Sequence, residues 1–170
     1  MNYIFKLAEM NDIDKIFKIY QNVVFHLRKL NIDQWDEVYP TKEILRNDIE
    51  EKSLFVVFDT LNNIPISSIV INESQEPEYK SVNWANTKGK ICVIHRFCVE
   101  PVFQRRGIGN KTLLSAEDYI MKKRYSSIRL DAFTENLSAL NFYKRNGYVF
   151  RGQVVFRKGI FNCYEKIFDY

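Results

Sequence analysis

A short segment in the middle of the chain has the residue types of a phosphate-binding turn. It consists of Gln104, Arg105, Arg106, Gly107, Ile108 and Gly109, and it follows an apolar, strand-like run over 91–99. It opens a stretch in which apolar residues recur at helical spacing, at Ile108, Leu113, Ala116 and Ile120. The first turn of a helix has unpartnered N–H groups and a positive dipole end, and glycine lets an anion approach closely. The segment therefore predicts a site for phosphate groups, such as a pyrophosphate.

The elements that must hold this turn alternate between strands and helices. Strand patterns cover 3–7, 54–58, 66–71, 91–99, 127–133 and two terminal segments around 148–157 and 162–168. Helical patterns follow Asn11 and Thr41, which we expect as N-caps, and cover 107–123 and 137–146. Asn136 is the expected cap of the last helix, and Asn146 with Gly147 its expected stop.

The order of these elements predicts one α/β domain over 1–170. A strand, a helix and a strand joined by short connections imply a right-handed parallel crossover, and the last two strands imply an antiparallel pair. We expect a mixed sheet flanked by helices. The polar stretch 73–90 has no clear period and is either a loop or a strand extension around Val82 to Trp84.

Composition excludes several classes of protein. The chain has 170 residues, is 46% hydrophobic and 27% charged, and has a net charge of +4, too weak to indicate nucleic-acid binding. No signal peptide or membrane span is apparent. Cys92 and Cys98 lie on one predicted strand, roughly 20 Å apart, so they cannot form a disulfide with each other, and Cys163 stands alone. His26 and His95 have no metal-ligand spacing, so we expect a reduced, cytoplasmic protein without a bound metal.

These features resemble the GNAT superfamily of acetyl-CoA-dependent N-acetyltransferases. Besides the turn at 104–109, the segment from Asn136 to Tyr148 is similar to the family's N-x-x-A-x-x-x-Y-x-x-x-G-F/Y motif, with Ala139, Tyr143 and Gly147 in place. The strand ending Val99-Glu100-Pro101 has the family's V-x-P form. Motif similarity covers roughly 91–150, and the first 90 residues agree only in element order. The resemblance implies a mostly antiparallel sheet with a parallel strand pair, 92–99 and 127–133, splayed around the cofactor.

The resemblance also implies acetyl-CoA as the cofactor and a set of residues that hold it. The pyrophosphate would lie in the turn and the first residues of the helix: Gln104, Arg105, Arg106, Gly107, Ile108, Gly109, Asn110 and Lys111. The pantetheine arm would lie like an added strand along Phe97, Cys98 and Val99. Asn136 would hold the amide region of the arm, and Tyr143 would lie near the thioester sulfur.

Aminolysis of a thioester needs a neutral amine, a stabilised carbonyl oxygen and a proton for the leaving thiolate. By resemblance, Tyr143 is the candidate acid for the thiolate, and the main-chain N–H of Val99 is the candidate donor to the carbonyl oxygen. The other interpretation of Tyr143 is a core tyrosine on an amphipathic helix.

The base is less well specified by the sequence. Many relatives have a glutamate on the central strand, which contains none here, so His95 becomes the candidate for receiving the amine proton. The alternative is a hydrogen-bonded histidine packed in the sheet. We expect Arg96 on the opposite face to pack under a helix or pair with a carboxylate, and Cys98 to be a buried core residue rather than a nucleophile.

By resemblance, Trp35 and Tyr39 lie where this family forms one wall of the acceptor site, so they are candidate substrate contacts. The alternative for Trp35 is a core residue that fills the space under its loop. The leading interpretation is an N-acetyltransferase that moves an acetyl group to a primary amine, on a small molecule or a peptide, by direct attack in a ternary complex. The alternative is an acyl-CoA-binding sensor or partner module without turnover. No nucleic-acid or membrane partner is expected, and a monomer or a homodimer is compatible with the sequence.

Overall fold

The computed structural model describes residues 3–169. Its strands are β1 (Tyr3–Leu7), β2 (Leu54–Asp59), β3 (Ile64–Asn72), β4 (Ile91–Val99), β5 (Ser127–Phe133), β6 (Val149–Phe156) and β7 (Gly159–Ile167). Its helices are α1 (Ile13–Lys29), α2 (Lys42–Glu50), α3 (Ile108–Lys122) and α4 (Leu137–Arg145), with short 3-10 turns η1 (Met10–Asp12), η2 (Pro77–Ser81) and η3 (Pro101–Phe103). No helix among residues 3–169 is both long and apolar enough to cross a membrane.

The strands form a sheet in the order β1-β2-β3-β4-β5-β7-β6. The pairs β1/β2, β2/β3, β5/β7 and β6/β7 are antiparallel, whereas β4 and β5 are parallel from Ile91–Ser127 to Val93–Arg129. This arrangement confirms the predicted mixed, mostly antiparallel sheet with one parallel pair. The described residues divide into two compact units, and the single-domain organisation over 1–170 stays a prediction.

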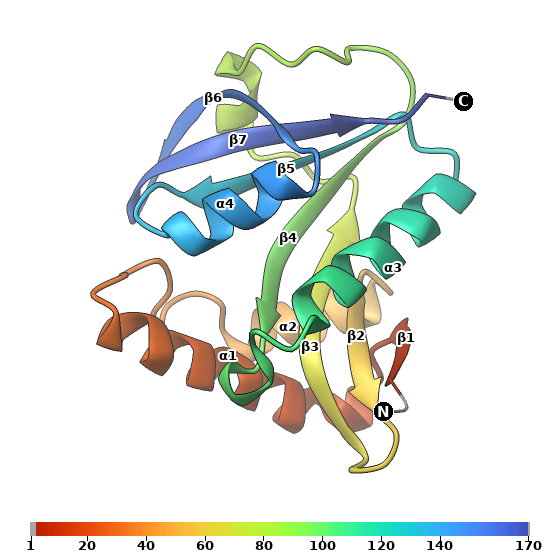
Figure 1. The fold of residues 1–170 in the computed structure, drawn as a ribbon, viewed down its shortest axis with the longest axis vertical. Helices are drawn as coiled ribbons and strands as arrows, with labels where there is room; N and C mark the ends of the chain where they lie inside the picture. Colours follow the sequence, from red (N-terminus) through yellow and green to blue (C-terminus); the bar gives the residue numbers. More distant parts are fainter. Residues whose placement is uncertain (1–2, 170) are drawn as a thin grey trace. The chain divides into compact units, whose positions relative to one another are not determined.

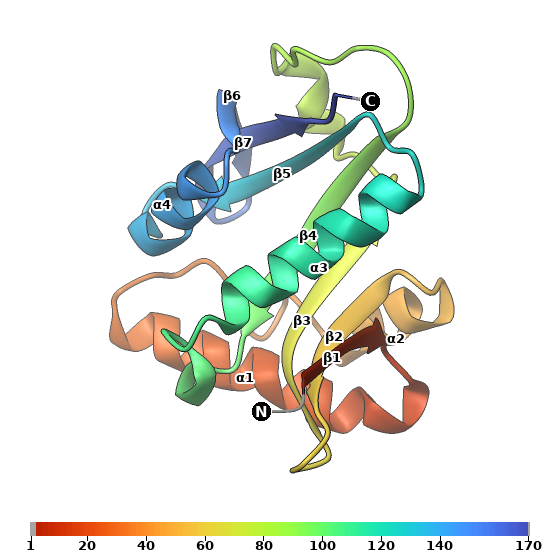
Figure 2. The same cartoon turned by 45° about the vertical axis from the view of Figure 1, so that its right-hand side comes forward.

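The first unit comprises the described residues up to Ile71 together with Arg96–Asp118. Figures 1 and 2 show its strands with α1 and α2 on one face and the first part of α3 on the other. Successive residues of a strand point to opposite faces, so Val56 packs with Ile16 and Leu45 whereas Val57 packs with Ile108. The cluster with Val57 also contains Phe103 and Ile108, which flank the turn before α3, so it holds that turn against the sheet.

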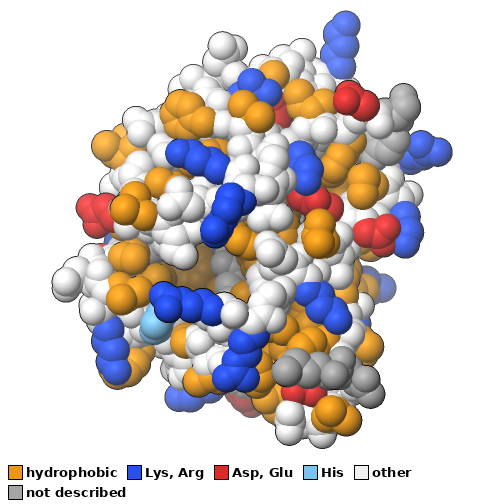
Figure 3. All heavy atoms as spheres, in the orientation of Figure 1, with side chains coloured by type: hydrophobic (Ala, Val, Ile, Leu, Met, Phe, Trp, Pro, Cys, Tyr) orange, Lys and Arg blue, Asp and Glu red, His pale blue; other side chains and the backbone are white. Residues whose placement is uncertain are grey.

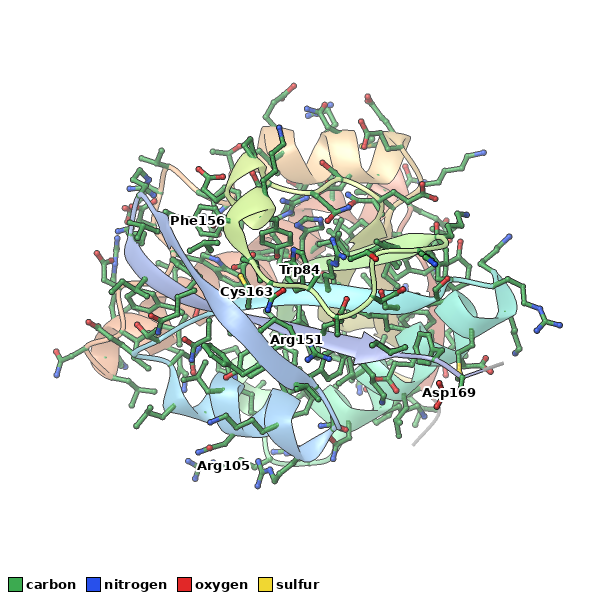
Figure 4. All side chains as sticks on the ribbon, turned by 90° about the horizontal axis from the view of Figure 1, so that it is seen from above. Trp84, Arg105, Arg151, Phe156, Cys163 and Asp169 are labelled. Atoms are coloured by element: carbon green, nitrogen blue, oxygen red, sulfur yellow. The ribbon has the colours of Figure 1, made fainter. Side chains whose placement is uncertain are left out.

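The second unit comprises Asn72–His95 and the described residues from Tyr119 onward. Leu130 of β5 pairs with Tyr164 of β7, whose ring centroid lies 6.3 Å from that of Tyr143 on α4. The preceding residue of β5, Arg129, points to the opposite face, where its guanidinium carbon lies 4.3 Å from the ring centroid of Trp84. Helix α4 and the segment 73–90 therefore cover opposite faces of β5 and β7, as Figures 1 and 4 also show.

Most expected elements are confirmed, although β3 and β7 are longer than the expected 66–71 and 162–168. Three other features differ from the expectation. Asn11 is not the cap of α1, because it lies inside η1; Asp12 occupies the cap position, without a side-chain cap bond. Helix α3 begins one residue later than expected because Gly107 has a φ of +79°, outside the helical region. The stretch 73–90 is a loop with a 3-10 turn, η2, so the alternative of a strand around Val82 to Trp84 is wrong.

Candidate functional site

The turn before α3 has the geometry that anion binding requires. Arg105 and Gly107 both have left-handed backbones, with φ of +58° and +79°, so the chain reverses sharply into the helix. A Cβ built on Gly107 would meet nothing within 4 Å, so that side of the turn is open. The 15-residue helix α3 begins directly after it at Ile108, so the positive end of the helix dipole lies at the turn. These observations fit a bound pyrophosphate.

The cations predicted around this turn are exposed. Arg105, Arg106 and Lys111 are all accessible to solvent, and Figure 3 shows Lys and Arg side chains over the segment that joins β4 to α3. Arg105 points away from the ribbon in Figure 4. The guanidinium carbon of Arg106 lies 5.7 Å from the ring centroid of Phe103, and Lys111 Nζ lies 5.3 Å from that of Tyr3. Each of these two cations therefore lies near the face of an aromatic ring.

Other residues predicted to contact the cofactor also make contacts within the fold. The Gln104 side chain donates a 3.1 Å hydrogen bond to the carbonyl oxygen of Val99, which ties the turn to the end of β4. Ile108 is buried in the core under α3. Gly109 and Asn110 lie in the first turn of α3, where Gly109 is half-buried and Asn110 is exposed.

The end of β4 presents its side chains to both faces of the first unit. Phe97 and Val99 pack in the cluster with Ile108, whereas Cys98 packs in the cluster under α1 and α2. Burial raises the pKa of the Cys98 thiol, which disfavours the reactive thiolate. The prediction that Cys98 is a core residue is therefore confirmed.

Arg96 adopts a left-handed conformation within β4, with a φ of +48°. Its guanidinium forms two hydrogen bonds to Asp48 of α2, at 3.0 and 2.6 Å, and a third, of 2.9 Å, to the Tyr39 hydroxyl oxygen. The expected pairing of Arg96 with a carboxylate is confirmed. Trp35 is 7% exposed, and its ring centroid lies 5.6 Å from that of Tyr20, so its burial favours the core plug over a substrate contact.

The second unit carries the second motif. Asn136 caps α4, because its Oδ1 accepts a 3.1 Å hydrogen bond from the N–H of Ala139, as predicted. Tyr143 is 7% exposed and lies among aromatic rings, 5.7 Å from that of Tyr148 between centroids. Gly147 ends the helix with a φ of +83°, also as predicted.

His95, the candidate base, is half-buried in the second unit. Its Nε2 lies 2.9 Å from Asn72 Oδ1 and 3.1 Å from the carbonyl oxygen of Ser74. The carbonyl oxygen can only accept, so Nε2 carries the hydrogen, and in a neutral ring Nδ1 is then the basic nitrogen.

Asp131 and Tyr79 are polar residues that the sequence analysis missed. The Tyr79 hydroxyl, from η2, donates a 2.7 Å hydrogen bond to Asp131 Oδ2 on β5. Burial raises the pKa of Asp131 to about 6, although the Tyr79 hydrogen bond opposes this shift. The only sequence signal was a single acid within an otherwise apolar stretch, Leu130 to Phe133, directly ahead of the second motif.

Comparison with known proteins gives consistent results. A model of the acetyltransferase (GNAT) family matches residues 24–148. The uncharacterized N-acetyltransferase MJ1207 of Methanocaldococcus jannaschii is 35% identical over 68 residues, which cover 39% of this chain and 30% of that protein. The uncharacterized N-acetyltransferase YesJ of Bacillus subtilis is 24% identical over 148 residues, or 85% of this chain and 81% of that protein.

The fold is similar to that of a GNAT-family acetyltransferase from Streptococcus agalactiae 2603, with a TM-score of 0.86 and 21% identity, covering 99% of this chain and 96% of that one. Members of this family use acetyl-CoA as the acyl donor. The family model covers well over half of the sequence and includes both motifs. The chain therefore belongs to the acetyltransferase (GNAT) family.

Proposed function

We propose that this protein transfers an acetyl group from acetyl-CoA to a primary amine by direct attack in a ternary complex. The observation that carries the proposal is the open, left-handed turn at Gly107 ahead of α3, because it fits the pyrophosphate of the cofactor that this family uses. The motif residue Tyr143 supports catalysis rather than binding alone.

Bound acetyl-CoA supplies the acetyl group as a thioester. Within the chain, N–H groups of Arg105, Gly107, Ile108, Gly109 and Asn110 would hold the pyrophosphate, with Gln104 fixing the turn and Arg106 and Lys111 adding positive charge. The main chain of Phe97, Cys98 and Val99 would hold the pantetheine arm, and Asn136 its amide region.

Three groups of the chain would then serve the reaction. The N–H of Val99 would donate to the acetyl carbonyl oxygen as it gains negative charge. The hydroxyl of Tyr143 would give its proton to the departing sulfur. His95 is the candidate base from the sequence, through Nδ1, and Asp131 is a second candidate from the structure.

The acceptor is a primary amine of a small molecule or a peptide, and Tyr39 is the proposed contact on its side. The hydroxyl oxygen of Tyr39 accepts a hydrogen bond from Arg96, and this bond holds its ring against the Arg96–Asp48 pair. Tyr39 is half-buried, so part of the ring remains accessible.

The first test is calorimetric titration with acetyl-CoA and with CoA. The matched pair is Gly107→Ala, at the open turn, and Gly159→Ala, at a left-handed glycine in the β6–β7 hairpin. We expect affinity to fall in the first variant only. Thiol release with a polyamine, an antibiotic amine, an amino acid and a peptide N-terminus then tests catalysis. Acetyl-CoA binding without turnover of any amine would favour the acyl-CoA-binding module, and no binding would overturn both functions.

A further inference from the structure

Asp131 is a carboxylate in the middle of β5. It is half-buried, and its Oδ2 accepts the 2.7 Å hydrogen bond from Tyr79. Among residues 3–169, no Lys or Arg forms an ion pair with it, and the nearby charge of Glu76 makes ionisation less favourable. Burying a charge without a partner is costly, so a carboxylate with a purely structural role would be paired.

Glu165 is a buried carboxylate of the second unit that is paired with cations, unlike Asp131. Glu165 is fully buried, and its oxygens lie 3.4 Å from Arg129 Nε and 3.1 Å from Arg151 Nε. The N–H groups of Ala85 and Asn86 also donate to Glu165 Oε2, at 2.9 and 3.3 Å. Figure 4 shows Arg151 and Trp84 beside β5 and β7, where this cluster lies. Both residues, Glu165 and Asp131, face the segment 73–90, yet only Glu165 is neutralised.

Asp131 and Tyr143 lie on opposite faces of β5. Leu130 and its partner Tyr164 face α4, which carries Tyr143, so the next residue, Asp131, faces the segment 73–90 together with its partner Cys163. An acid for the leaving sulfur and a base for the incoming amine are then available from different sides of one strand. That division suits donor and acceptor substrates that enter from different sides.

The strand register also relates Asp131 to His95. Val93 of β4 is the parallel partner of Arg129, and His95 and Asp131 each lie two residues further along their strands. Residues two apart on a strand point to the same face, so both side chains lie on the face of segment 73–90, just beyond the last paired residues, Val93 and Arg129. His95 is hydrogen-bonded to Asn72 and Ser74 there, through its N–H.

We propose that Asp131, rather than His95, accepts the proton that the attacking amine releases, with Tyr79 as the positioning residue for its carboxylate. This inference rests on the proposed amine acetylation. Asp131 gains the proton that the amine loses when its nitrogen bonds to the acetyl carbon. Tyr143 gives its proton to the sulfur as the carbon–sulfur bond breaks, and exchange with solvent restores both groups.

The acidity of Asp131 suits this role. A carboxyl with a pKa of about 6 is ionised at neutral pH and is a stronger base than an ordinary aspartate. The titratable groups that act on it are Tyr79 and Glu76 from the segment 73–90, and its strand partner on β7 is Cys163. His95 of β4 and Arg129 of β5 point to the same face of the sheet. Burial raises the pKa of Tyr79 well above its usual value and that of Cys163 to about 12, so neither ionises near neutral pH.

The test compares Asp131→Asn, Tyr79→Phe and His95→Gln, with the exposed Asp169→Asn, labelled in Figure 4, as the control. At pH 7 we expect Asp131→Asn to lower kcat/KM for the best amine by roughly 100-fold, with unchanged acetyl-CoA affinity by calorimetry. The deficit should shrink as the pH rises toward ~10.4, the pKa of a lysine-like amine, because solvent hydroxide can then accept the proton that the nitrogen releases on attack.

Tyr79→Phe gives a readout that a merely structural role would not produce. Loss of its hydrogen bond raises the Asp131 pKa, so the acid limb of the pH–rate profile should move to higher pH. Carboxyl ¹³C NMR should show one aspartate that titrates near pH 6 and is absent from Asp131→Asn.

Three results would overturn the inference. One is an active wild type whose rate and acid limb survive in folded Asp131→Asn. Another is an acid limb that disappears in His95→Gln while Tyr79→Phe leaves it in place. The third is a wild type that turns over no amine, which removes the proposed function and this inference with it.

Discussion

The Tyr20 hydroxyl donates a 2.8 Å hydrogen bond to the carbonyl oxygen of Arg96, the residue at which β4 adopts a φ of +48°. The same hydroxyl lies 3.0 Å from Ser68 Oγ, and Asp48 holds the Arg96 guanidinium. A left-handed backbone at a residue other than glycine costs roughly 1–2 kcal/mol and persists only where its surroundings impose it. Helices α1 and α2 thus fix the local shape of β4 just before Phe97.

Replacing Tyr20 by Phe should destabilise the protein by about 1–2 kcal/mol, because a part-buried carbonyl oxygen and the buried Ser68 hydroxyl lose their partner. Urea unfolding measures the change. Tyr125→Phe is the matched control: its hydroxyl donates to the exposed Glu73, so its loss should be smaller. Equal losses in the two variants would contradict the special role of the Arg96 carbonyl.

Gly107→Ala should cost about 1 kcal/mol of stability, because a left-handed backbone is strained in alanine although the space around it is open. Gly159→Ala, with a φ of +127°, should cost at least as much, because its Cβ would lie 3.4 Å from Phe133. Thermal unfolding measures both changes. A larger loss for Gly107→Ala than for Gly159→Ala would show that the turn is packed rather than open.

Asn136→Ala should lower stability by about 1 kcal/mol, because α4 loses its side-chain cap. Asn136→Ser restores a capping oxygen but no amide group, so it separates the cap from the proposed contact with the cofactor. We expect Asn136→Ser to recover stability in urea unfolding but to bind acetyl-CoA less tightly than the wild type. Full recovery of affinity would limit Asn136 to capping.

Glu165→Gln should cost about 3 kcal/mol, because Arg129 and Arg151 lose their shared partner in a buried site. Hydrogen exchange should also accelerate at Ala85 and Asn86, whose N–H groups donate to Glu165. Glu73→Gln, which alters an exposed pair with Lys90, should cost less than about 1 kcal/mol. Similar losses in both variants would contradict the role of Glu165 as the anchor of segment 73–90.

Asp131→Asn should stabilise the fold at neutral pH. The folded-state pKa of Asp131, about 6, lies above its unfolded value, so the native state binds the proton more tightly. This contribution favours folding below about pH 4 and is lost as the pH rises to about 6. Urea unfolding of the wild type and the variant should therefore diverge between these pH values, with a gain of about 1–2 kcal/mol for Asp131→Asn at pH 7. Parallel pH dependence would show that Asp131 titrates normally.

Local features of the fold were predictable from the sequence. Thr41 and Asn136 cap their helices, Gly147 ends α4, and the strands β1, β4 and β5 have the expected bounds, because caps, turns and apolar periods depend on neighbouring residues. The turn at 104–109 could be placed before a helix for the same reason. The cap of α1 was missed because a 3-10 turn preceded the helix.

Only the tertiary structure determined which distant side chains meet. Arg96 could be expected to find a carboxylate, but its pairing with Asp48 and its contact with Tyr20 depend on packing across 48 and 76 positions of sequence. The pairing of Tyr79 with Asp131 depends on the path of segment 73–90, which has no period of its own. Sequence determined the turn at 104–109 because one helix start is enough to build it, whereas the environment of Asp131 required a strand and a loop to be brought together.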